Sequence, residues 1–205
     1  FDIQVFDQII SLDYTNESNL RYFFDGALTK KTASFKNNNR ASVYDLSPYD
    51  ETLLMDTDYV ISNSLLNPVF NSSADFLIYK KSNDIAKVRD ESEFDKISDT
   101  SVDFYWATVV YFRKTDTNSL FRNDFAFSIA IHIMNGFQSG NFAQQLPGSM
   151  MYTTDKDVLW KMNEDEMMFL VEKKDYLGEY TAIKTSGQTI HVMNKQSLNR
   201  IIDEE

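Results

Sequence analysis

Two apolar stretches near the middle of the chain decide the predicted fold: residues 103–114, DFYWATVVYFRK, and residues 124–134, DFAFSIAIHIM. In the second stretch bulky side chains alternate with small or polar ones, which is the period of a strand with one buried face. Residues 115–119, TDTNS, are rich in turn formers. The sequence therefore predicts that 103–114 and 124–134 form a long antiparallel hairpin.

The N-terminal half is predicted to be helical. Residues 20–28 carry Leu, Phe and Ala at the spacing of a broad apolar helix stripe, and residues 3–10 carry a shorter version of the same pattern. Ser47-Pro48 is followed by two acidic residues, which is typical of a helix start. We therefore expect a third helix over 48–62.

The remaining segments alternate between short elements and polar connections. Residues 76–79 are predicted as a strand, 81–102 as a solvated acidic connection and 135–154 as a loop. Residues 163–174 have the acidic start and basic end of a helix, with a strand through Met168 and Leu170 as the alternative. The C-terminus is predicted to form a hairpin of 180–184 with 189–193 and a short helix capped by Ser197.

Together these elements predict an α+β fold, with a helix-rich N-terminal half packed on an antiparallel β-sheet formed mainly by the C-terminal half. We expect one α+β domain over residues 1–205, with a possible subdivision near 81–102. The order of elements resembles that of cone-shaped folds such as the cystatin-like fold. That resemblance implies a pocket between helix and sheet that binds a small ligand or performs hydrolysis.

The composition excludes several classes of function. The 205 residues include 2 His and no Cys. The chain therefore cannot form a disulfide, use a thiol nucleophile or bind a metal through Cys. A net charge of −11 opposes binding to a phosphate backbone, so no nucleic-acid partner is expected. We also find no apolar run long enough to cross a bilayer.

Few residues form a recognisable chemical motif. His132 and His191 lack the spacing of a metal site, and we expect no metal and no cofactor. Asp56-Thr57-Asp58 has the spacing seen at the start of calcium loops but lacks the glycine turn and the later bidentate acid. A solvated helix end explains these acids better, and a calcium-stabilised domain remains a third possibility. We identify no catalytic residue and leave open whether the chain is an enzyme, although the lack of catalytic motifs favours a non-enzyme.

The aromatic content is the one positive indication of function. The chain has 16 Phe, 11 Tyr and 2 Trp, more than one face of each predicted strand can bury. Aromatic side chains are enriched in the cores of protein interfaces. We therefore predict an interface that includes several aromatic residues from the second faces of strands and from loops: Tyr105, Tyr111, Phe137, Phe142 and Tyr152.

The sequence thus favours a non-enzymatic protein–protein interaction module, a structural subunit or extracytoplasmic domain of a larger assembly. Its partner would be a protein, either a second copy or another chain. Because the sequence opens at Phe1 without a methionine, we expect a processed product, an expressed fragment or the ordered part of something larger. The absence of cysteine suits an oxidising exterior, which favours a surface or extracytoplasmic location. The alternative is the cone-type pocket, in which His132 and Trp106 bind a ligand with Asp103 or Asp124 nearby.

Overall fold

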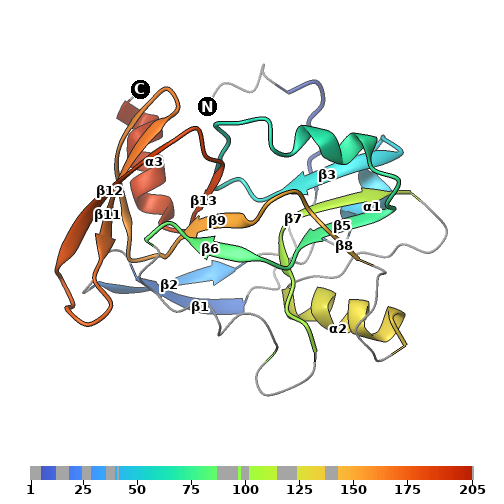
Figure 1. Cartoon of the computed structure of the whole chain (residues 1–205), viewed down its shortest axis with the longest axis horizontal. Coiled ribbons are helices and arrows are strands. Elements are labelled where there is room, and N and C mark those ends of the chain that lie inside the picture. Colours follow the sequence, from blue (N-terminus) through green and yellow to red (C-terminus); the bar gives the residue numbers. More distant parts are fainter. Residues whose placement is uncertain are drawn as a thin grey trace.

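The computed structural model shows a mostly β-sheet molecule (Figure 1). It describes residues 6–12, 19–24, 29–35, 40, 42–86, 97, 102–114, 124–136 and 143–204. No helix among these residues is long and apolar enough to span a membrane. The predicted helix-rich N-terminal half is therefore wrong, because strands supply most of the regular structure before residue 114.

A four-stranded sheet, which we call the β7 sheet, carries the first part of the core. Its order is β3-β7-β5-β8, and β7 pairs antiparallel with both neighbours while β8 is parallel to β5. The strand predicted over 103–114 and the strand predicted over 76–79 are both confirmed here. The sheet consists of β3 (Glu51–Met55), β5 (Phe76–Tyr79), β7 (Trp106–Arg113) and β8 (Gln144–Gln145).

A second four-stranded sheet, the β9 sheet, lies beside it with the order β4-β13-β9-β6. Here β13 is antiparallel to β4 but parallel to β9, and β6 is also parallel to β9. Residues from distant parts of the sequence therefore meet in this sheet. Its strands are β4 (Tyr59–Val60), β6 (Ser82–Asp84), β9 (Met150–Thr153) and β13 (Ile190–Val192).

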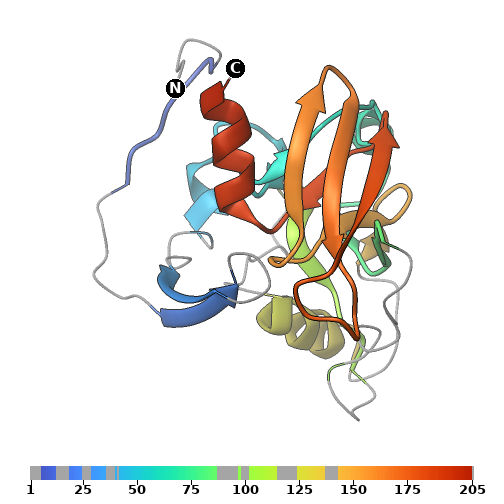
Figure 2. The same cartoon turned by 90° about the vertical axis from the view of Figure 1, so that its left-hand side faces the viewer.

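A three-stranded antiparallel sheet, the β11 sheet, forms the other end of the molecule next to helix α3 (Lys195–Glu204) (Figures 1 and 2). The helix predicted over 163–174 is wrong, because this segment contains a tight turn in which Glu164 has a φ of 46°. The strand alternative is correct. The sheet consists of β10 (Val158–Asn163), β11 (Glu166–Glu172) and β12 (Tyr180–Ser186).

The predicted C-terminal hairpin is also wrong, because β12 pairs with β11 whereas β13 pairs with β4 and β9. The helix that follows is confirmed as α3. Its N-cap is Asn194, whose side chain accepts a hydrogen bond from the Ser197 amide at 3.1 Å. Ser197 instead uses its hydroxyl to accept a bond from the Leu159 amide of β10 at 3.0 Å.

Segment 20–28 was predicted as a helix, but residues Asn19–Phe24 form strand β1, paired with β2 (Lys30–Phe35) in a separate hairpin. Leu20 and Tyr22 are more than two-thirds exposed, so these two side chains of β1 lie at the surface. The Lys30 ammonium lies 4.2 Å from the centre of the Tyr22 ring. Of the helix expected over 3–10, the described part, residues 6–10, has no regular structure.

The helix expected over 48–62 is replaced by strands β3 and β4. A short helix, α1 (Val43–Leu46), ends at Ser47, whose ψ of 128° is extended. Proline disfavours a helical conformation in the residue before it, so Pro48 ends one helix here instead of starting another. A turn follows β4 and leads to the 3₁₀ helix η3 (Asn67–Asn71), which has Pro68 in its first turn.

The hairpin of 103–114 with 124–134 is wrong as well, because Asp124–Met134 forms helix α2. Phe127 and Ile131 are buried against one face of the β7 sheet, together with Tyr105, Val110 and Phe112. The opposite face of β7 packs against the β9 sheet through Trp106, Tyr111, Met150 and Tyr152, among other residues. A third apolar cluster joins α3 to the β11 sheet and β13.

Candidate functional site

The structure separates the two residues assigned to a ligand pocket. Trp106 is buried on the face of the β7 sheet that meets the β9 sheet, where its ring stacks 5.8 Å from that of Tyr152. His132 lies on α2, which covers the opposite face of the same sheet. Asp103 is ion-paired with Lys80 at 2.8 Å. The sheet stands between His132 and Trp106, so they cannot share one pocket.

Three residues assigned to an interface lie inside this chain instead. Tyr105, Tyr111 and Tyr152 are 6%, 0% and 5% exposed, and each belongs to an apolar cluster. Phe137 and Phe142 lie outside the described residues. The large exposed apolar side chains of the described chain occur elsewhere, and a group of them surrounds a pocket beside β3.

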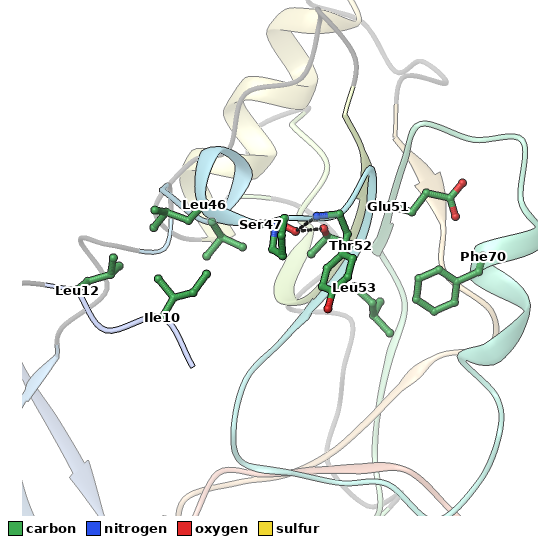
Figure 3. A pocket seen from close by; sticks show the side chains of 11 residues that line it. Ile10, Leu12, Leu46, Ser47, Glu51, Thr52, Leu53 and Phe70 are labelled. Carbon is green, nitrogen blue, oxygen red and sulfur yellow. Dashed lines mark hydrogen bonds between the residues drawn. The ribbon is translucent and has the colours of Figure 1, made fainter. Parts of the chain in front are cut away.

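This pocket, which we call the β3 pocket, has a volume of about 590 Å³. Figure 3 shows Ile10, Leu12 and Leu46 on one side and Phe70 on the other, with Thr52 and Leu53 of β3 between them. Five apolar or aromatic residues of its wall remain 37% to 57% exposed: Ile10, Leu12, Leu46, Tyr49 and Phe70.

Local geometry explains why the β3 pocket stays open. The Ser47 hydroxyl is 2.6 Å from that of Thr52 and accepts a hydrogen bond from the Tyr49 amide, which holds the turn before β3 (Figure 3). Glu51 is bound by two nitrogens of the Arg113 guanidinium at 3.0 and 2.8 Å. These contacts hold the side chains of Ser47, Thr52 and Glu51 in place at the pocket wall. The apolar side chains of the wall remain exposed to solvent.

A second group of side chains brings together residues that are far apart in the sequence. Asp56, Asp58 and His191 lie with ligand atoms within 4.8 Å of one another, and we call these residues with Arg40 and Lys195 the Asp58 cluster. The His191 Nε2 is 3.1 Å from the Asp58 carboxylate, and the Lys195 ammonium is 3.2 Å from it. The pairing of β4 with β13 places Tyr59 opposite His191 and produces this meeting.

The Asp58 cluster is deeply buried at its centre. Asp58 and His191 are 5% and 6% exposed, and the His191 ring stacks on Tyr59 with 4.8 Å between ring centres. Burial opposes ionisation of Asp58, but the hydrogen bond and charge of His191 and the charge of Lys195 outweigh it and lower the pKa of Asp58. For Asp56 burial prevails over the neighbouring Arg40 and raises the pKa of the carboxyl.

The charges of the Asp58 cluster are already balanced by the chain. Arg40 pairs with Asp56, and Lys195 pairs with Asp58. A divalent cation placed among the carboxylates would face both cationic side chains at close range, which opposes metal binding. The sequence indicated Asp56 and Asp58 through their spacing. It contained no signal for His191, which reaches these acids only because β13 pairs with β4.

Other buried carboxylates have backbone partners that account for them. Asp84 accepts a hydrogen bond from the Ala86 amide at 3.1 Å. Asp157 accepts bonds from the Thr154 and Glu172 amides at 2.9 and 3.1 Å. Glu172 pairs with Lys156 and accepts a bond from the Gly178 amide. These groups hold turns and strand ends, so they are structural.

A scan against protein-family models found no match, and neither did searches of curated proteins and of solved structures. The function proposed below therefore rests on the geometry of the chain alone.

Proposed function

We propose that this chain is a protein-interaction module, a subunit of a larger assembly, which binds its partner at the β3 pocket. The observation that carries the proposal is the pocket itself, about 590 Å³ in volume and walled by half-exposed apolar side chains from three separate segments. Contiguous exposed apolar surface rimmed by polar groups is characteristic of protein interfaces.

The composition of the pocket wall favours a protein over a small substrate. Ile10, Leu12, Leu46 and Phe70 offer apolar contact. Glu51, the one acidic residue among the described lining, is already held by Arg113. A catalytic pocket needs convergent polar groups that are free to act on a substrate. The aromatic residues that support the proposal, Tyr49 and Phe70, differ from those that the sequence suggested.

Site-specific cross-linking tests this function. A photoreactive phenylalanine analogue would replace Phe70 at the pocket wall, and in a matched control it would replace Tyr176, which is 61% exposed at the turn between β11 and β12. In extract of the source organism, we expect the Phe70 probe to cross-link one defined protein and the Tyr176 probe to give no such product.

The expected product should also disappear when the pocket is altered elsewhere. Leu46→Asp introduces a charge on the opposite wall and should reduce cross-linking from the Phe70 probe at least tenfold. A Phe70 probe that yields no protein product, or the same products as the Tyr176 probe, would show that the β3 pocket is not an interface.

A further inference from the structure

One edge of the β7 sheet, unpaired among the described strands, lies at the β3 pocket. β3 is the last strand on its side of the sheet, and it pairs only with β7 among the described strands. The Asp56 amide donates to the Thr108 carbonyl at 2.9 Å, and the Lys114 amide donates to the Asp50 carbonyl at 2.8 Å. These two bonds show which residues of β3 face β7. The even-numbered residues direct their amides and carbonyls toward β7 and bond to it.

The odd-numbered residues of β3 therefore direct their backbone groups away from β7, since alternate residues of an edge strand face outward. These residues are Glu51, Leu53 and Met55. Within the described chain, no hydrogen bond reaches their amides or carbonyls. Five residues of β3 extend about 17 Å and present this unpaired row to any strand that comes alongside.

The pocket supplies side-chain sites along the same edge. Leu53 carries unpaired backbone groups and also lines the pocket, between Leu46 on one wall and Phe70 on the other (Figure 3). An added strand would run about 4.8 Å from β3, with alternate side chains directed to opposite walls. Backbone bonds would give affinity, and the walls would select apolar side chains at alternate positions.

The charges around the pocket indicate which residues would flank the apolar part of the added strand. Asp45 and Asp50 are sequence neighbours of the lining residues Leu46 and Glu51; both are exposed and have no ion pair among the described residues. The nearby cations are engaged, because Arg113 binds Glu51 and the Lys114 ammonium donates to the Ser47 carbonyl at 2.6 Å. The chain as a whole carries −11, which opposes association with a second copy and favours a basic partner.

We infer that β3 accepts an extended segment of another protein as an added strand, with apolar side chains in the β3 pocket and Lys or Arg on its flanks. This inference rests on the proposed function and names the chemistry of the partner. In this inference the backbone amides and carbonyls of Glu51, Leu53 and Met55 bind the added strand. Asp45 and Asp50 favour a partner with positive charge.

The test uses the full chain and the peptide KKVTFTVKK, with EEVTFTVEE and KKVTPTVKK as matched controls. On saturation with the first peptide, amide hydrogen exchange of Glu51, Leu53 and Met55 should slow at least tenfold, because these amides become bonded. The amides of Thr52 and Leu54, already bonded to β7, should change little. The glutamate peptide should bind at least tenfold more weakly at low salt, with the difference shrinking in 0.5 M salt.

A pair of variants at Leu53, which lines the pocket, separates backbone from side-chain recognition: Leu53→Ala removes the side chain but keeps the outward amide, and serves as the control for Leu53→Pro. Leu53→Pro removes the outward amide while sparing the β7 ladder, since proline is tolerated on an edge strand with its nitrogen turned outward. It should abolish binding of KKVTFTVKK. The exchange measurement on the unaltered chain decides the matter if this variant does not fold.

Several results would overturn the inference. Absence of binding at 1 mM peptide, equal binding of the glutamate or proline peptide, or pocket shifts without protection of the three amides would each do so. Protection of the same amides by self-association, without peptide, would identify a second copy as the occupant and refute the basic partner. The proposed function is decided separately, because a specific cross-link from Phe70 can occur whether or not these amides become protected.

Discussion

Asp58 is an almost fully buried carboxylate whose partners come from the far end of the chain. Its carboxylate lies within 3.2 Å of both His191 and Lys195, so the negative charge has partners at a position that is only 5% exposed. A buried charge that loses its partner costs much more than an exposed one. We therefore expect the ionised form of Asp58 to stabilise the junction between β4 and β13.

Replacement of this charge should destabilise the protein at neutral pH. We expect Asp58→Asn to lower the free energy of unfolding by about 1 to 3 kcal/mol at pH 7, because His191 and Lys195 lose their shared acceptor. The control Asp50→Asn, at an exposed residue with no ion pair among the described residues, should change it by less than about 0.5 kcal/mol. Denaturant unfolding of the three proteins at pH 7 measures both differences.

The pH dependence of that difference has a defined sign. The pKa of Asp58 is lowered in the folded chain, whereas in the unfolded chain it is about 3.9. Ionised Asp58 therefore stabilises the fold above about pH 4, and this contribution is lost as the pH falls through the lower folded value. The gap between the native protein and Asp58→Asn should shrink as the pH falls below about 4; an unchanged gap would contradict this account.

Among the elements, α2 shows most clearly where a sequence pattern is ambiguous. An alternating apolar pattern also contains pairs four residues apart, such as Phe127 and Ile131, and these lie on one face of a helix. The helix buries that pair and exposes Ile129 and Ile133, each about half accessible to solvent. The Ser128 hydroxyl, which accepts a bond from the Tyr105 amide at 2.8 Å, adds a contact that periodicity cannot reveal.

Two matched substitutions distinguish this helix from a strand. Phe127→Ala removes a side chain that is 2% exposed and should lower the free energy of unfolding by about 3 to 5 kcal/mol. Ile129→Ala alters a side chain that is 49% exposed and should cost less than about 0.5 kcal/mol. In a strand the two side chains would share one buried face, so similar losses in thermal unfolding would argue against α2.

Some elements could be predicted and others could not, for identifiable reasons. β7 is buried on both faces, so its long apolar run indicates a strand without reference to its partners. The C-terminal helix has a polar cap and apolar residues at helical spacing, both local features. By contrast, the Asp58 cluster and the β3 pocket each join segments distant in sequence, and a single sequence contains no signal for such pairings.

The whole molecule is connected through β9. Met150 and Tyr152 of this strand belong to the cluster shared with the β7 sheet, and Met151 between them packs against the cluster of α3 and the β11 sheet. One strand therefore contributes to two apolar clusters on its opposite faces. We expect the two ends of the molecule to unfold together, as one cooperative unit.

The two tryptophans allow a test. Trp106 is buried between the β7 and β9 sheets, whereas Trp160 lies on β10, half exposed under the Arg200 guanidinium. In Trp160→Phe, fluorescence reports Trp106 alone and far-ultraviolet circular dichroism reports all the sheets. The two denaturation midpoints should coincide within error. Separate midpoints would show that the β7 sheet and the β11 sheet are independent units.

The position of β13 in the β9 sheet also determines when this protein can fold during its synthesis. β13 lies between β4 and β9, yet its residues follow those of β4 by most of the length of the chain. A ribosome adds about 5 to 20 residues per second, so β4 and β9 emerge with an unfilled gap between them for seconds. Until β13 arrives, the nascent chain exposes two unpaired strand edges to other chains, and such edges favour aggregation during synthesis.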